Sequence, residues 1–268
     1  MVAGDVTRRA SLTAPSMHRR PSARRGSLIK NPQTQSQILS ASLYIVDHLP
    51  EGAQGLWAIV NCESWCALGE LEWVPFSVIR RAMEVNLLGP SRLVQVMLPL
   101  VRRARGRVVL ASSILTHVAA PVRGVHAASL AALDALAACL RRELKPRGVD
   151  VRQTKPRLVI VAAGEYTTGS AWLSEEKLLE QARDMWKRLS DEQKGAYGED
   201  YFETALRSLE KYTKSADADL TAVTRALSDG VTRTFPLSRY TPVSPREKLK
   251  SILAEHLPRS LYEGLYTD

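Results

Sequence analysis

Short apolar segments alternate with long helical segments through the middle of this chain. Residues 56–61, 107–112 and 149–154 have the length and composition of buried strands. Helical patterns fill the gaps between them, over 75–103 and over 125–145. Because strands joined by helices of this length form right-handed crossovers, the alternation predicts an α/β domain built on a parallel sheet.

Further helices are expected on both sides of this alternation. Upstream of Pro50, one helical face is apolar and consists of Ile38, Leu39, Leu43 and Val46. Downstream, residues 190–193 and 244–247 both have the spacing of a capping box, which opens a helix. We therefore predict two or three helices over 174–230, and a last strand over 237–243.

The first thirty residues differ from the rest of the chain in charge. The net charge is +9, and residues 1–30 hold seven Lys and Arg residues against one acid, Asp5. Few large apolar residues occur there, so this segment cannot bury enough surface to offset its ordering entropy. The sequence predicts a disordered basic tail over 1–34 and a folded domain over 35–268.

Three interpretations of this tail stay open. A start that is rich in Arg and Ser and poor in acids is typical of a mitochondrial transit peptide. Residues 8–11 and 24–27 resemble basic-directed kinase sites, where a phosphate would reverse the local charge. A solvated tail with no specific role is the third interpretation. The protein is accordingly expected in mitochondria or in the cytoplasm.

Composition argues against several classes of function. No apolar run reaches the ~18 residues that a membrane-spanning helix needs. The three cysteines, Cys62, Cys66 and Cys139, give neither a disulfide framework nor a set of metal ligands. The basic tail has no interleaved aromatic residues, which argues against binding to nucleic acid.

The place of a functional site follows from the predicted sheet. In an open parallel sheet, ligands bind in the crevice outside the carboxyl ends of the strands. We therefore expect the site at the loops that follow Val60, Ala111 and Thr154.

A resemblance to a known family is carried by four segments in matching order and spacing, residues 55–61, 84–89, 106–113 and 140–144. With them, the chain resembles the short-chain dehydrogenase/reductase superfamily from Gln35 to the C-terminus. It is most similar to the branch that holds 3-hydroxybutyrate, retinol and hydroxysteroid dehydrogenases. Three more segments extend this likeness, residues 185–189, 196–198 and 256–258.

The resemblance implies hydride transfer between NAD or NADP and a small alcohol or ketone substrate. In the family, a Tyr moves the proton, and a Lys lowers the pKa of that Tyr and holds the nicotinamide ribose. A Ser binds the substrate oxygen, and an Asn completes a proton relay. Carried over by position, the Ser is Ser113 and the Asn is Asn86. The Tyr position holds His126, and the Lys position holds Leu130.

These two replacements bear directly on activity. An imidazole can act as an acid or a base near neutral pH, so His126 is a candidate catalytic residue together with Ser113 and Asn86. Leu130 offers the ribose neither a charge nor a hydrogen-bond donor. No metal is implied. The resemblance places three residues against the cofactor, namely Asn61, Leu130 and Pro156.

The chain departs from the family at the loops that face the cofactor. The family has Asn-Asn-Ala-Gly after one strand, where this chain carries the charged Glu63. It has Pro-Gly after another strand, where we place Pro156 and Arg157, and Arg cannot approach a nicotinamide as closely as Gly. Before Gln35 there is no Gly-rich turn of the kind that seats a pyrophosphate.

The fold expected is therefore an incomplete Rossmann-like parallel sheet, flanked by helices and followed by a helical lid over 174–230. The first strands of the family are missing, which leaves four strands and an unpaired edge at residues 56–61. An apolar edge strand invites pairing or aggregation. We expect either that another element covers this edge or that the sequence is an incomplete version of a longer protein, and we favour the latter.

Three functions are compatible with these residues. The first is a catalytically impaired short-chain dehydrogenase-like protein of oxidoreductase ancestry. The second is an active NAD(P)-dependent alcohol dehydrogenase in a longer isoform, with a hydroxybutyrate-, retinol- or steroid-like substrate. The third is a non-enzymatic oligomeric scaffold. The resemblance also implies a homo-oligomer with its interface at helices 75–103 and 125–145, and a peripheral membrane contact at the lid.

Overall fold

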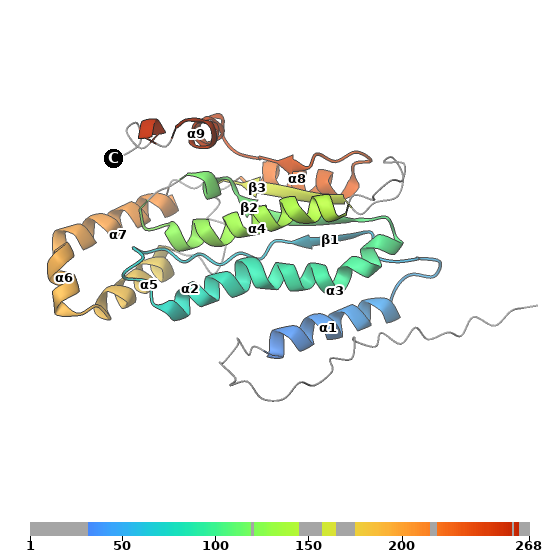
Figure 1. The fold of residues 1–268 in the computed structure, drawn as a ribbon, viewed down its shortest axis with the longest axis horizontal. Helices are drawn as coiled ribbons and strands as arrows, with labels where there is room; N and C mark the ends of the chain where they lie inside the picture. Colours follow the sequence, from blue (N-terminus) through green and yellow to red (C-terminus); the bar gives the residue numbers. More distant parts are fainter. Residues whose placement is uncertain are drawn as a thin grey trace, which may run out of the picture. The chain divides into compact units, whose positions relative to one another are not determined.

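The computed structural model describes residues 32–118, 121–144, 157–164, 175–214, 219–258 and 260–262, and those from Gln33 onward form one compact unit. The basic tail predicted over 1–34 lies almost wholly outside these ranges. Figure 1 labels the helices and strands. Their bounds in chain order are α1 (Pro32–Asp47), β1 (Ala58–Asn61), α2 (Phe76–Met83), η1 (Glu84–Leu88), α3 (Gly89–Arg103), β2 (Arg107–Ser113), η2 (Ile114–His117), α4 (Gly124–Glu143), β3 (Arg157–Ala163), α5 (Glu175–Lys187), α6 (Asp191–Tyr197), α7 (Glu199–Lys214), α8 (Thr221–Thr232), β4 (Arg239–Tyr240) and α9 (Pro245–His256).

The four strands form one parallel sheet in the order β1-β2-β3-β4. β1 pairs with β2 from Ala58 opposite Arg107, and β3 pairs with β4 from Ile160 opposite Arg239. The predicted α/β fold, with helices around a parallel sheet, is confirmed. The open edge is present as well, because within the described ranges β1 pairs on one side alone, and 43% of Val60 is exposed.

The third strand lies later in the chain than the sequence analysis predicts. Residues 149–154 are outside the described ranges, and β3 instead covers Arg157–Ala163 and pairs with β2 along all seven of its residues. A parallel strand inside a sheet is buried on both faces and needs a continuous apolar run. Residues 158–163 are such a run, whereas the predicted segment carries Asp150, Arg152 and Gln153.

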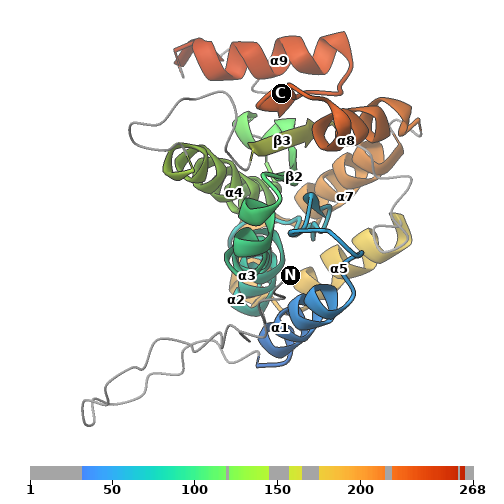
Figure 2. The same cartoon turned by 90° about the vertical axis from the view of Figure 1, so that its right-hand side faces the viewer.

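Hydrophobic layers cover both faces of the sheet. On one face, α3 and α4 pack over the strands through buried residues such as Val101, Leu133 and Ile160. On the other face, α8 packs through a cluster that includes Ala226 and Val161. Figure 2 shows α4 and α8 on opposite sides of the strands. This double cover is what a parallel sheet requires, since both of its faces are apolar.

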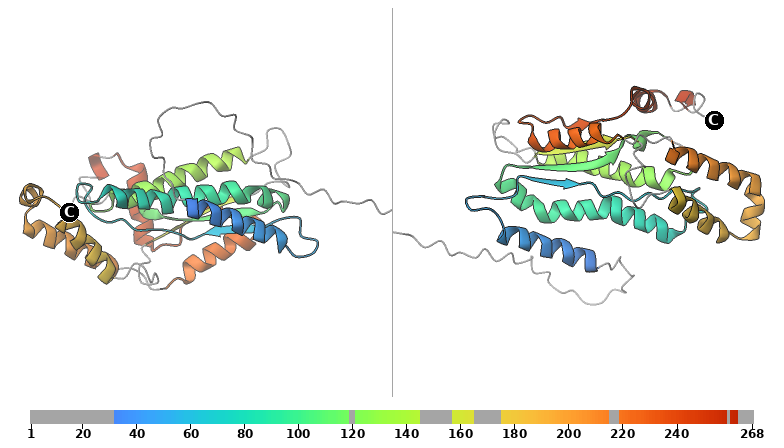
Figure 3. Two further views of the ribbon diagram at one scale, coloured as in Figure 1. Left: turned by 90° about the horizontal axis from the view of Figure 1, so that it is seen from below. Right: turned by 180° about the vertical axis from the view of Figure 1, so that it is seen from behind.

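The helical region after β3 has two separate roles. The prediction of two or three lid helices over 174–230 is wrong, because four helices occur and the last of them, α8, covers the sheet. α5, α6 and α7 lie together at one end of the sheet (Figure 3). They share their own hydrophobic core with parts of residues 66–82. Its centre is Trp73, whose ring makes edge-to-face contacts with Trp186, Tyr197 and Phe202.

The helix predicted before Pro50 forms as α1, but its apolar face is largely exposed. Leu39, Leu43 and Val46 are 49%, 51% and 40% exposed. The buried side of α1 carries Ser42 instead, and Ile45 packs partly against the core beneath α3. The spacing of apolar residues therefore predicts the helix correctly but not the face that it buries.

One described helix, α4, is long and apolar enough to cross a membrane, with a mean hydropathy of 1.2. The sequence analysis predicts no such segment. In this structure one side of α4 packs into the domain through Val125, Leu133 and Ala137. Its Asp134 forms an ion pair with Arg239 at 2.9 Å. Length and hydropathy alone are thus weak grounds for a membrane span here.

Candidate active site

The carboxyl ends of β1, β2 and β3 meet at one edge of the sheet, where the sequence predicts the site. Asn61 is the last residue of β1, and Ser113 is the last residue of β2. The Asn61 side chain is buried, and its Nδ2 has no hydrogen-bond partner among the described residues. Ser113 is half-buried, and its carbonyl accepts a hydrogen bond from Thr116 Oγ1 at 3.1 Å.

The third strand contributes a different residue from the one predicted. Pro156 lies outside the described residues, and Arg157 is the first residue of β3 rather than a residue beyond its end. The prediction that Arg157 follows this strand is therefore wrong, and the prediction for Pro156 lies outside the described residues. Gly164 follows the strand instead, so the glycine that the family pattern requires is present.

Asn86 is the centre of a buried hydrogen-bond network. It lies in the π-helical turn η1 and is fully buried. Its Oδ1 accepts a hydrogen bond from the Trp65 N–H at 2.7 Å. Its Nδ2 donates to the Trp65 carbonyl at 2.9 Å and to Ser129 Oγ at 2.8 Å. Both N–H groups of the amide are thus used to join the loop after β1 to α4.

The network continues to the backbone of His126. Ser129 is fully buried, and its hydroxyl donates to the His126 carbonyl at 2.8 Å. Sequence reasoning missed both Trp65 and Ser129, since neither residue belongs to the family's catalytic pattern. The structure therefore brings Asn86 and His126 together through partners that hold the backbone in place.

His126 lies in the first turn of α4, and its Nδ1 is buried without a hydrogen-bond partner in the described part of the chain. Burial lowers the pKa of the imidazole to about 4. A hydrogen bond with the Trp65 backbone raises this pKa, and the charge of Arg123 lowers it. The ring is neutral at pH 7, and a group with a pKa so far from the working pH is a poor proton carrier.

Leu130 lies one helical turn beyond His126 and is 3% exposed. Its side chain is buried and has no atom that could donate a hydrogen bond. The position that the family resemblance gives to the ribose-binding Lys is thus filled by a packed aliphatic residue.

A carboxylate occupies the space beside Gly164. A Cβ atom added to Gly164 would lie 2.7 Å from Oε1 of Glu247. Glu247 is held there by the capping box of α9, where its Oε2 accepts from the N–H and the hydroxyl of Ser244 at 2.9 and 2.8 Å. The sequence predicts this capping box, but nothing local in it indicates that the box lies beside the sheet edge.

The described residues at this edge fit a nicotinamide cofactor poorly. The close approach that Gly164 would permit is filled by the carboxylate of Glu247, and Leu130 offers no charge. Two buried polar atoms, Asn61 Nδ2 and Ser112 Oγ, have no partner in the part of the chain described here. Across the same residues, no group of three or more His, Cys, Asp and Glu side chains could hold a metal ion.

The low pKa of His126 makes stability depend on pH. In the unfolded chain the imidazole has a pKa of about 6.5, so only the unfolded state takes up this proton between roughly pH 6.5 and 4. The contribution of the neutral His126 imidazole to the free energy of unfolding is complete above about pH 6.5 and is lost as the pH falls toward 4. In the wild type, the free energy of unfolding should therefore fall by roughly 3 kcal/mol between pH 7 and 4 because of His126. In His126→Gln this part of the decrease should be absent.

Urea unfolding of the wild type and the variant across this pH range measures the effect. His48→Gln is the control, because His48 is exposed. If the stability curves of wild type and His126→Gln ran parallel, burial of a neutral imidazole would be refuted.

Comparison with known proteins agrees with the fold. The profile of the short chain dehydrogenase family matches residues 34–167, and the chain belongs to this family. It is 30% identical to the mitochondrial D-beta-hydroxybutyrate dehydrogenase of Rattus norvegicus over 218 residues, which is 81% of this chain and 62% of that protein.

Two other relatives belong to the branch that the motifs indicate. Retinol dehydrogenase 16 of Mus musculus is 31% identical over 94% of this chain and 76% of its own length. The 17-beta-hydroxysteroid dehydrogenase type 6 of Homo sapiens is 31% identical over 86% of this chain and 69% of its own length. The predicted resemblance to this branch is confirmed, although the chain spans only 62% of the length of the rat hydroxybutyrate dehydrogenase.

A solved structure shares the fold. A short-chain dehydrogenase from Streptomyces avermitilis superposes with a TM-score of 0.55 at 18% identity, over 87% of this chain and 76% of that one. The parallel sheet with helices on both faces is thus a fold that this dehydrogenase shares. The enzymes of the short chain dehydrogenase family are oxidoreductases.

Proposed function

We propose that this chain is a short-chain dehydrogenase in which hydride transfer is impaired. The observation that carries the proposal is the burial of Leu130, at 3% exposure, where the family pattern has its ribose-binding Lys. His126 supports it, since a partly buried imidazole with a pKa of about 4 stands at the Tyr position of the family pattern. The Glu247 carboxylate also supports it, because it puts a negative charge beside Gly164, the glycine that follows β3.

An active NAD- or NADP-dependent alcohol dehydrogenase is the second candidate. Two buried polar atoms at the sheet edge, Asn61 Nδ2 and Ser112 Oγ, favour it because they are unsatisfied among the described residues. Such atoms commonly mark a place where a ligand or water completes the hydrogen bonding. In this case the catalytic residues would be Ser113 and His126.

Turnover assays separate the two candidates. The chain is supplied with NAD⁺ or NADP⁺ and, in turn, 3-hydroxybutyrate, retinol and a 17β-hydroxysteroid, and reduced nucleotide is measured. The rat hydroxybutyrate dehydrogenase serves as the positive control. We expect this chain to turn over at least about 10²–10⁴-fold more slowly than the control enzyme, because the positioned Tyr and Lys of the family pattern are replaced. Turnover within tenfold of the control enzyme would support the second candidate and overturn the first.

We further propose that the chain forms homo-oligomers through α4. Only 28% of the apolar window of this helix is buried within the chain. Ala128, Ala135, Leu136 and Cys139 are exposed on it, and small residues of this kind allow a partner helix to approach closely.

The mass of the protein in solution tests this interface. The wild type should elute as a multiple of 29.7 kDa in size-exclusion chromatography with light scattering. Ala135→Glu should give the monomer mass, because a carboxylate in an apolar interface has no partner. Ala222→Glu, at an exposed position of α8, is the control. A monomeric wild type would contradict the proposal.

A further inference from the structure

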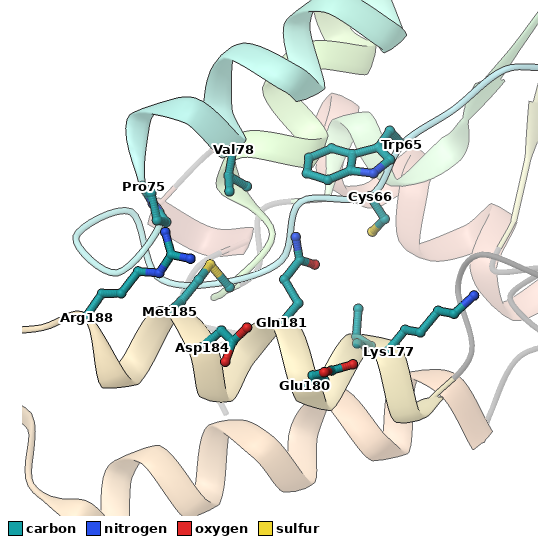
Figure 4. A pocket seen from close by; sticks show the side chains of 11 residues that line it. Trp65, Cys66, Pro75, Val78, Lys177, Glu180, Gln181, Asp184, Met185 and Arg188 are labelled. Carbon is teal, nitrogen blue, oxygen red and sulfur yellow. The ribbon is translucent and has the colours of Figure 1, made fainter.

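A groove separates α5 from the segment that leads from β1 into α2 (Figure 4). Its volume of about 340 Å³ is at the lower end of the range for small-molecule sites. Five of its lining residues belong to the hydrophobic core around Trp73 or pack against it, namely Trp65, Cys66, Val78, Leu178 and Met185. Because Leu178 and Met185 are each 3% exposed, close packing fixes this wall in place.

Polar groups enter the groove from one face of α5. Gln181, Asp184 and Arg188 recur at a spacing of three and four residues, which puts them on the same side of the helix. In Figure 4 the Arg188 guanidinium and the Gln181 amide extend from α5 toward the opposite wall, whereas the carboxylates of Glu180 and Asp184 stay close to the helix. The Asp184 carboxylate also forms an ion pair with Lys187, whose Nζ lies 3.9 Å from Oδ1.

We propose that this groove binds a slender apolar molecule that ends in a carboxylate. Arg188 holds the carboxylate through charge-assisted hydrogen bonds, which are stronger than neutral ones. The apolar body lies along Trp65 and Val78, which are only partly buried. Gln181 and Arg188 are seven residues apart, which is about 10 Å along a helix, and an extended medium-chain acid has this length.

The groove shares Trp65 with the Asn86 network but does not include the candidate catalytic side chains. The residues that line it include neither Ser113 nor His126. Binding there needs no nucleotide and no hydride transfer, so its test is independent of whether the protein is an active dehydrogenase.

Isothermal titration of the full chain with octanoate, octan-1-ol and octylammonium tests the ligand class. The three probes share one apolar chain and differ in the charge of the end group. We expect octanoate to bind about tenfold more tightly than octanol, as one charge-assisted contact provides. Octylammonium should bind no more tightly than octanol.

Two variants test the role of Arg188. Arg188→Gln should weaken octanoate binding about tenfold and leave octanol unchanged. Arg183→Gln is the matched control, because Arg183 is an exposed cation of the same helix and does not line the groove. Absence of octanoate binding at millimolar concentration would overturn the proposal. Equal affinity for octanol, or equal effects of the two variants, would overturn it as well.

Discussion

Asn86→Ala is expected to destabilise the domain by about 3–5 kcal/mol. The variant loses three hydrogen bonds and leaves the N–H and C=O of Trp65 and the hydroxyl of Ser129 without this partner. These groups lie next to a fully buried side chain, so water cannot easily replace the amide. Urea unfolding at pH 7 measures the loss in free energy.

A smaller deletion in the same network serves as the control. Ser129→Ala removes one hydroxyl from the network and should cost about 1–2 kcal/mol. If Asn86→Ala cost less than Ser129→Ala, Asn86 would not be the structural centre that we infer. The family role of this residue as a water-relay Asn would then be the better account.

Leu130→Lys, which restores the family's residue type, is expected to destabilise the protein by about 3–5 kcal/mol without restoring activity. The side chain at this position is 3% exposed, so an ammonium there would lose its hydration. Burial would also lower the pKa of the Lys, and a neutral amine could not anchor a ribose through its charge.

Leu130→Met is the matched control for this experiment. It keeps the volume and the apolar character and should cost less than about 1.5 kcal/mol. Equilibrium unfolding in urea measures both variants. If Leu130→Lys were as stable as the wild type, position 130 would face an open, polar space, and the argument for an impaired site would lose its main support.

Much of the fold follows from sequence patterns that act locally. The alternation of short apolar runs with helical segments predicts the parallel sheet, and the capping boxes at Ser190 and Ser244 both form as predicted. β4 lies within the predicted range 237–243 but covers only Arg239–Tyr240. Signals of this kind depend on a few neighbouring residues, which is why they can be recognised in one sequence.

The errors in the fold arise where two segments compete for one role. Residues 149–154 and 158–163 both have strand character, and only pairing with the central β2 favours the more apolar run. In the same way, nothing in α8 itself distinguishes a lid helix from one that covers the sheet. That difference depends on contacts with Val109 and Val161, far away in the chain.

The sequence predicts the elements that carry the candidate site residues but not the contacts of those residues. Ser113 lies on β2, Asn86 lies in η1, and His126 and Leu130 lie on α4. The family resemblance cannot show that the Asn86 amide is engaged by Trp65 and Ser129, or that Glu247 lies against Gly164. These contacts join elements between 21 and 83 residues apart in the chain, so local spacing does not reveal them.

A titration of the chain with NADH and with NADPH, followed by nucleotide fluorescence, tests the central claim most directly. Without an ammonium at position 130, and with the Glu247 carboxylate beside Gly164, neither nucleotide should bind saturably. Saturable binding of either nucleotide at micromolar concentration would contradict the account.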